Sequence, residues 1–289
     1  MTNSDLPGFF QDADAAARRG QRRTLRWNRI RLVATVAAAV GGALPWKIGS
    51  FEFWAAVAVA GFAVALAVEI VLLATHPERD WFNGRAVAES VKTLAWRFAV
   101  GGDPFPATVP PKQARTELRR QVAAVLPTGE GRLALGSDDP CATPGMTGLR
   151  ARPFAQRRAA YLAERVLDQK RWYADKARTN ERRALLWRLV LVVGELTALG
   201  LAACRLAGLW DLDLSGVMAA AVAGGAAWLG LRRHSALASA YGRAAAELAL
   251  VHDHLVDVDE DEWPAAVAQA EGVMTDERTL WLNTRPSDQ

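Results

Sequence analysis

Four long apolar runs, grouped in two pairs with basic residues at their borders, constrain the fold of this chain most strongly. They cover residues 32–46, 53–75 and 214–231 and the segment between Arg188 and Arg205. A membrane-spanning helix needs about 17–25 residues, counting ends from which long basic side chains reach the interface. The mean hydropathy of the whole chain is only +0.01, because charged residues are concentrated between these runs. The pattern predicts an all-α integral membrane protein with two tandem helical hairpins and four transmembrane helices.

The placement of basic residues predicts the orientation of these hairpins. Basic residues gather at the outer ends of each pair of runs, whereas the short turn inside each pair has few. The flanking residues are Arg18, Arg19, Arg22, Arg23, Arg26, Arg29, Arg31, Arg79, Arg85, Lys92, Arg97, Lys176, Arg178, Arg182, Arg183, Arg232, Arg233 and Arg243. Cytosolic flanks of membrane helices are rich in Lys and Arg. We therefore expect a multi-pass protein of the bacterial inner (plasma) membrane with cytosolic N- and C-termini. A soluble bundle with Ala-rich core helices is the alternative, but it does not explain this charge asymmetry.

Two pairs of short motifs indicate an internal duplication. QRRTLRW at 21–27 matches ERRALLW at 181–187, and GRAVAE at 84–89 matches GRAAAE at 242–247. The two offsets differ by only two residues, so both halves keep one register. We expect a first two-transmembrane repeat at 1–105 and a second at 153–289. Between them, residues 106–152 are predicted to be a Pro/Gly-rich linker containing a short helix at about 113–125.

A long helix is predicted from about Pro153 into the third apolar run, because neither Gly nor Pro occurs again before Gly194. Together with helices near residues 80–98 and 235–255 it is expected to form a cytosolic bundle. Several of its planar and cationic residues recur at steps of three and four and so share one side of the helix. They include Tyr161, Arg165, Gln169, Trp172, Lys176 and Asn180. This side is interpreted as a solvated and inter-helical packing face, with a cytosolic signal or partner surface as the alternative.

Three tryptophan-containing segments resemble the SLATT family of two-transmembrane domains. They are SVKTLAWRFAVGGDPF at 90–105, YLAERVLDQKRWYADKARTN at 161–180 and GVMTDERTLW at 272–281. Members of that family occur beside nucleotidyltransferases that make second messengers, or beside nucleotide-sensing SLOG domains. The resemblance implies a tandem pair of SLATT domains in a prokaryotic anti-phage conflict effector that oligomerises and permeabilises the membrane. It also implies a nucleotide-signalling or sensor protein encoded nearby as a partner, and it brings no catalytic residues.

The predicted spans contain two carboxylates, Glu69 and Glu195, which need a partner, protonation or water. A charged residue at the centre of a span costs about 2.5–3.5 kcal/mol on insertion scales. Two interpretations stay open. Either Arg188 or a polar neighbour satisfies the carboxylates, or they line a cation-favouring pore in a homo-oligomer. Gly216, Ala220 and Gly224 lie four residues apart in the fourth run, a spacing that allows close helix packing.

Signals of enzymatic chemistry are not found in the sequence. It contains no phosphate-binding Gly-rich loop, no paired cysteines for zinc and no nucleophile elbow. The adjacent residues of His252-Asp253-His254 point to different sides of a helix, so a metal site is not expected there. We expect that the protein is not an enzyme, that it needs no cofactor and that it binds no nucleic acid. The lipid bilayer is its main expected partner. The functions left open are a permeabilising effector, a non-conducting scaffold for a partner and, less favoured, a small transporter.

Overall fold

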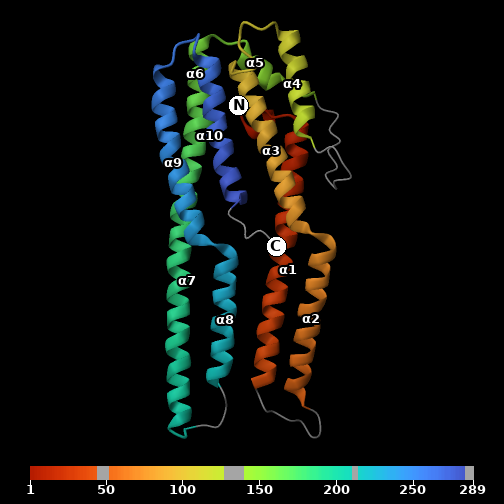
Figure 1. Ribbon diagram of the computed structural model, residues 1–289, viewed down its shortest axis with the longest axis vertical. Helices are drawn as coiled ribbons and strands as arrows, with labels where there is room; N and C mark the ends of the chain where they lie inside the picture. The colour runs from red at the N-terminus through yellow and green to blue at the C-terminus, as the bar shows by residue number, and fades with distance from the viewer. Residues whose placement is uncertain (44–51, 127–139, 210–213, 284–289) are drawn as a thin grey trace. The chain divides into compact units, whose positions relative to one another are not determined.

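The computed structural model describes residues 1–43, 52–126, 140–209 and 214–283, and all regular elements in these ranges are helices (Figure 1). In chain order they are η1 (Asn3–Asp5), α1 (Gly8–Ala43), α2 (Phe53–Thr75), α3 (Pro77–Val100), α4 (Pro111–Val125), α5 (Pro144–Arg150), α6 (Phe154–Tyr161), η2 (Leu162–Leu167), α7 (Asp168–Leu206), α8 (Leu214–Arg232), α9 (His234–Asp257) and α10 (Trp263–Asn283). The predicted all-α class is confirmed for this part of the chain.

The chain divides into two compact units. Unit 1 comprises Met1–Gly20, Glu78–Ala177 and Ser239–Gln289, and unit 2 comprises Gln21–Pro77 and Arg178–Ala238. The two units do not coincide with the two repeats predicted from the sequence, because each repeat contributes residues to both. Unit 2 contains both predicted hairpins.

Unit 1 is built around a hydrophobic core rich in large side chains. Its fully buried members include Trp96, Phe98, Phe105, Leu118, Met146, Tyr161, Leu248, Leu255 and Trp263. The short helix predicted near 113–125 is α4, and its Ala114, Leu118 and Val122 are buried. α5 contributes Met146 and Leu149. The described parts of residues 106–152 therefore belong to the folded core of unit 1 instead of forming a separate connection.

The C-terminal end of α3 is fixed by a glycine and by hydrogen bonds to its last carbonyl groups. Gly101 adopts a left-handed backbone conformation, with φ of 79°, which ends the helix. The carbonyl of Val100 accepts hydrogen bonds from Arg157 at 2.8 Å and from the Trp263 indole at 3.0 Å. Arg150 donates to the carbonyls of Phe98 and Phe105 at 2.9 and 2.7 Å. Cationic donors at a helix C-terminus satisfy its last carbonyls and complement its dipole.

Unit 2 contains two antiparallel hairpins, α1 with α2 and α7 with α8 (Figure 1). The first is packed backbone to backbone. A Cβ atom at Gly61 would lie 2.6 Å from the Ala34 carbonyl oxygen, and one at Gly41 would lie 2.7 Å from the Ala58 nitrogen. In the second hairpin a Cβ at Gly194 would lie 2.6 Å from a Val222 methyl. Glycine in these helices thus serves close approach, as it does between membrane helices.

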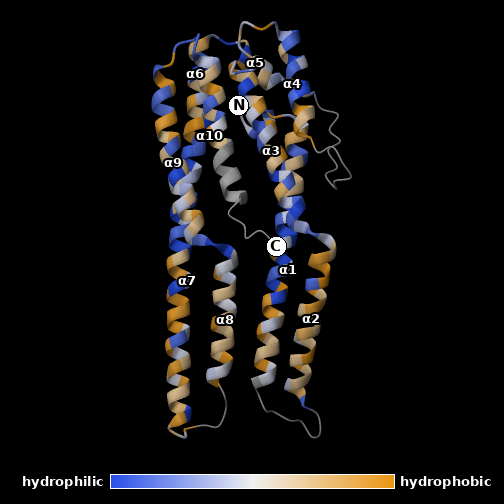
Figure 2. Cartoon of the chain, viewed as in Figure 1, coloured by the Kyte–Doolittle hydropathy of each residue, from blue (hydrophilic) through white to orange (hydrophobic). Residues whose placement is uncertain are grey.

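Within the described ranges, three helical stretches are long and apolar enough to cross a membrane. They lie in Phe53–Thr75, Phe154–Leu206 and Leu214–Asp257. Apolar residues follow α2 and the second half of α7 (Figure 2), and many of them are exposed, among them Phe62, Leu66, Leu196 and Leu199. Of the predicted first run, residues 44–46 lie outside the described ranges. The four-span arrangement therefore stays a prediction.

The long helix predicted from about Pro153 is confirmed. Residues Phe154–Leu206 form one continuous helix of 53 residues, in which the six residues of η2 have π-helical geometry. No Gly or Pro interrupts it until Gly194, which faces Val222 without breaking the helix. The first part of this helix, up to Ala177, belongs to unit 1, and the rest belongs to unit 2.

Candidate functional site

A buried carboxylate organises the polar centre of unit 1. Glu271 of α10 has 0% of its surface exposed. Its oxygens accept hydrogen bonds from Arg165 Nε at 2.9 Å and from Arg165 Nη2 at 2.6 Å. The Tyr161 hydroxyl donates at 3.0 Å and the Thr93 hydroxyl at 2.9 Å. One carboxylate therefore joins three separate stretches of helix, α3, the α6–η2 segment and α10, through what we call the Glu271 cluster (Thr93, Tyr161, Arg165 and Glu271).

Burial and charge set the protonation of the Glu271 cluster. Burial and the negative charge of Glu271 raise the pKa of Tyr161 well above its usual value, so the phenol stays a donor. Burial opposes the charged form of Arg165, but the Glu271 carboxylate outweighs it and raises the pKa of that guanidinium. Half-buried Lys92 lies nearby, and burial together with the charge of Arg165 lowers its pKa. The cluster is thus a charged pair held by neutral donors.

The π-helical segment η2 contains Arg165. A π-helical turn places more residues in each turn than an α-helix, and such turns are frequent at functional positions. Here the segment lies directly after Tyr161, and both side chains reach the same carboxylate. Arg165 Nη1 is buried and has no hydrogen-bond partner within the described residues. A buried N–H group left unpaired costs about 1–3 kcal/mol. The cluster therefore keeps one hydrogen-bond donor group of Arg165 unsatisfied.

The structure buries some residues of the face predicted on the long helix and exposes others. Tyr161, Arg165 and Asn180 are buried, so they cannot form one open surface with the others. Tyr161 and Arg165 are buried because α3, α9 and α10 pack around the start of the helix within unit 1. Asn180 is instead buried against His234 in unit 2. Trp172 is 38% exposed, and the Lys176 ammonium lies 5.5 Å from its ring centroid. Gln169 is half-buried. Only the Trp172 region therefore remains available as a partner surface.

Asn180 instead contributes to unit 2. Its side-chain oxygen lies 2.7 Å from His234 Nδ1, and both residues are buried. The pair joins α7 to the start of α9 next to Arg233, which has a left-handed φ of 45°. The contact fixes the bend between α8 and α9.

The two carboxylates of the predicted spans have different surroundings. Glu69 of α2 forms an ion pair with Arg31 of α1. Arg188, the partner suggested from the sequence, instead donates to the Ser235 hydroxyl at 3.2 Å. The hairpin explains the difference, because α1 and α2 run antiparallel and bring Arg31 beside Glu69. The sequence placed Arg31 only as a flanking charge.

Glu195 is exposed on α7 and has no hydrogen bond or ion pair within the described part of the chain. Its neighbours Val193 and Leu196 are 61% and 63% exposed. A carboxylate thus lies among apolar side chains on the outer surface of this helix.

The small residues singled out in the fourth run occupy α8. A Cβ at Gly224 would lie 3.2 Å from a Val36 methyl and 3.4 Å from a Leu32 methyl of α1, so Gly224 packs within this chain. Gly216 and Ala220 are half-buried. The tightest contacts, at Gly41 and Gly61, were not among the predicted positions. In the sequence, Ala34, Ala38 and Gly41 follow one another at steps of four and three, a pattern of small residues that could have indicated this contact.

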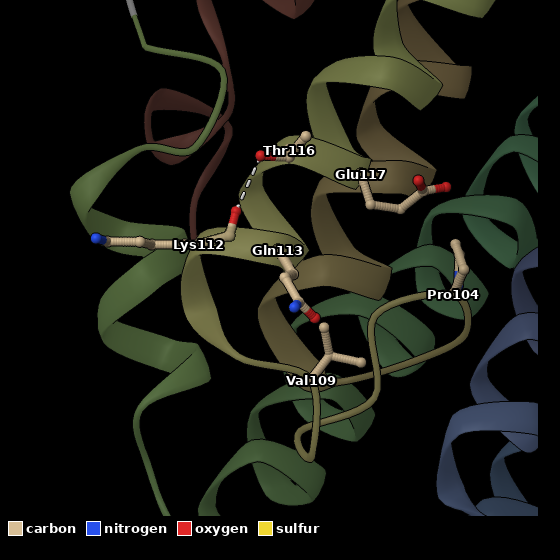
Figure 3. A pocket seen from close by; sticks show the side chains of 6 residues that line it. All are labelled: Pro104, Val109, Lys112, Gln113, Thr116 and Glu117. Carbon is tan, nitrogen blue, oxygen red and sulfur yellow. Dashed lines mark hydrogen bonds between the residues drawn. The ribbon is translucent and has the colours of Figure 1, made fainter.

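Other features of the described residues offer little chemistry. A hollow of about 510 Å³ lies beside α4 and is lined by Pro104, Val109, Lys112, Gln113, Thr116 and Glu117 (Figure 3). Arg120 and Gln121 donate to Glu117 and lower its pKa to about 2, so this carboxylate is already engaged. No group of His, Cys, Asp and Glu that could hold a metal occurs in the described ranges.

Comparison with known families decides the identity of the two repeats. Residues 7–158 match the SMODS and SLOG-associating 2TM effector domain 3, and residues 161–281 match the SMODS and SLOG-associating 2TM effector domain 1. The chain belongs to the SLATT family. The tandem pair of SLATT domains implied by the resemblance of the tryptophan-containing segments is confirmed. No curated protein and no solved structure matches the chain.

The SLATT match fits the geometry of unit 2. Two matches to two-transmembrane effector domains, together with the three apolar helical stretches found among the described residues, indicate a multi-pass membrane protein. SLATT domains are membrane effector domains associated with conflict systems and are not known catalytic folds.

Proposed function

We propose that this SLATT protein is an inner-membrane effector of a prokaryotic anti-phage conflict system, which oligomerises and permeabilises the membrane when a cytosolic signal arrives. In this proposal all four apolar runs span the membrane and both termini lie in the cytosol, as the positions of the arginines favour. Membership in a family of two-transmembrane effector domains supports the general role.

The surroundings of Glu195 carry the proposal of an oligomeric pore. An unpaired carboxylate among lipid-facing residues costs about 2.5–3.5 kcal/mol on insertion scales. Assembly of several chains around a hydrated path offsets this cost, because water then reaches Glu195. A ring of carboxylates would favour cations over anions. Glu69 contributes less to such a ring, since Arg31 already neutralises it.

The continuous helix from Phe154 to Leu206 offers a physical route for the signal. It carries Arg165 of the Glu271 cluster near its start and Glu195 further along. A partner that binds unit 1 more tightly in one arrangement of this helix would shift the population of open assemblies. A nucleotide-signalling or sensor protein encoded nearby is the partner we propose, and the exposed Trp172 and Lys176 are candidate contacts.

Membrane potential in living cells tests this function. The full chain is expressed with its genomic neighbours, and a potential-sensitive dye is followed after the system is triggered. We expect depolarisation and growth arrest from the natural chain. Glu195→Gln should reduce the cation preference of the conductance several-fold, because it removes the charge and keeps the size. Glu181→Gln, an exposed carboxylate earlier on the same helix, is the matched control and should behave as the natural chain.

A non-conducting scaffold is the second candidate function. It is favoured by the exposed Trp172, which packs against Tyr241 with ring centroids 5.7 Å apart and carries Lys176 on its surface. Such a rigid amphipathic patch suits a protein partner and requires no conduction. If triggered cells keep their potential while Trp172→Ala abolishes the biological effect, the scaffold function replaces the pore.

A further inference from the structure

An open, shallow cavity of about 380 Å³ lies on the surface of unit 2, where α7, α8 and the start of α9 meet. One end is apolar and is lined by Leu191, Ala226 and Leu229. The other end is polar and is lined by Arg233 and Ser235. None of the described residues that line it is Asp or Glu. The cavity thus combines an apolar half with a positively charged half.

The polar end gathers donors from three helices. Arg188 of α7 reaches the Ser235 hydroxyl at 3.2 Å, and Arg233 follows directly on α8. α9 begins at His234, so its first turn contributes N–H groups that have no acceptor within the helix and the positive end of its dipole. His234 also lines the cavity, and its ring is held by Asn180 through a contact of 2.7 Å. This combination of guanidinium groups, a hydroxyl and a helix N-terminus suits a phosphate group.

The apolar end excludes a free phosphate ion as the complete occupant. Leu191 and Leu229 would remain against water if only an ion were bound, whereas a hydrocarbon chain would cover them. The polar and apolar halves therefore match a molecule that has both a phosphate and an acyl chain.

We propose that this cavity binds an anionic glycerophospholipid of the surrounding leaflet. Its phosphodiester contacts Arg188, Arg233 and Ser235, and an acyl chain lies along Leu191, Ala226 and Leu229. A net negative headgroup is preferred, because a choline or ethanolamine cation would be repelled by the two arginines. The inference rests on the proposed placement of α7 and α8 in the bilayer, and it adds a specific lipid partner to the proposed function.

The test uses the purified full chain in detergent, to which defined lipids are added and bound molecules are counted by native mass spectrometry. We expect phosphatidylglycerol to bind at least about tenfold more tightly than phosphatidylcholine, since the two arginines repel the choline cation of the zwitterionic lipid. Glycerophosphoglycerol, which has the phosphodiester headgroup without acyl chains, should bind weakly. Equal binding of both lipids, or binding of glycerophosphoglycerol as tight as that of the lipid, would overturn the proposal.

Two variants locate the site, each with a matched control. Arg188→Gln with Arg233→Gln should remove the preference for phosphatidylglycerol, whereas Arg182→Gln, an exposed arginine elsewhere on α7, should keep it. Gly230→Leu fills the cavity, because a Cβ at Gly230 meets nothing within 4 Å. It should lower phosphatidylglycerol affinity about tenfold. Gly200→Leu adds the same side chain at another open glycine and should not.

The outcome separates this inference from the proposed function. A chain that depolarises triggered cells but shows no preference for anionic lipid contradicts only the lipid site. A chain that binds phosphatidylglycerol at this cavity but never depolarises cells contradicts only the pore.

Discussion

At the residue scale, the stability of unit 1 depends on a carboxylate that solvent does not reach. Glu271 accepts hydrogen bonds from half-buried Thr93 and from the buried side chains of Tyr161 and Arg165, so its loss leaves these donors unpaired. Breaking a buried ion pair by removing one partner costs about 3–5 kcal/mol, because the other charge remains buried. Glu271→Ala should therefore lower the thermal unfolding midpoint of the detergent-solubilised protein by several degrees.

Simultaneous replacement of the pair provides the control for Glu271→Ala. Arg165→Met with Glu271→Met removes both charges and keeps apolar volume, so most of the lost stability should return. If Glu271→Ala melts like the natural chain, the Glu271 cluster does not stabilise unit 1.

Partners of buried residues were the least predictable feature from the sequence. Glu271 lies in AVAQAEGVM, where a single carboxylate on an amphipathic helix indicates a solvent-facing position. Its arginine partner lies 106 positions away, and no local pattern joins the two. The partner of Glu69 was missed for a related reason. Arg31 is one of seven flanking arginines in its segment, and only the packing of α1 on α2 selects it.

At the element scale, the first hairpin depends on the contact between the backbones of α1 and α2. A Cβ at Gly61 would lie 2.6 Å from the Ala34 carbonyl oxygen, which cannot move without shifting the helix. Gly61→Ala should therefore destabilise the protein by about 1–3 kcal/mol, the usual cost of overpacking. The thermal unfolding midpoint in detergent measures this loss.

Gly200→Ala is the matched control, because a Cβ at Gly200 meets nothing within 4 Å. Alanine favours helix over glycine by about 1 kcal/mol, so this variant should melt at the same temperature or higher. Equal melting of the Gly61 and Gly200 variants would contradict a tight α1–α2 contact.

Helices themselves could be predicted well, because their signals are local. The apolar runs predicted α2 and α8, and the absence of Gly and Pro after Pro153 predicted the continuous helix from Phe154. The π-helical turn at Leu162–Leu167 has no comparable signal, since it differs from an α-helix only in hydrogen-bond register. The Pro/Gly content of 106–152 indicated a linker, but the apolar positions of α4 and α5 pack into the core.

At the scale of the whole molecule, the topology follows from the arginine asymmetry. Reporter fusions after Lys47 and Asp211 should read as external, and a fusion after Gln289 should read as cytosolic. Reversing the charge bias should disturb this result: replacing Arg22, Arg23 and Arg26 with Glu should lower the fraction of chains with an external reading after Lys47. A cytosolic reading at either turn of the natural chain would remove that hairpin from the membrane.

Ion flux through purified protein tests the central claim most directly. The chain is reconstituted into liposomes together with its signalling partner, and the release of potassium is recorded before and after the signal is supplied. The proposed pore predicts little flux at first, rapid cation flux after the signal, and a several-fold loss of cation preference in Glu195→Gln but not in Glu181→Gln. Liposomes that stay sealed after the signal, with correctly oriented protein in the bilayer, would contradict the account.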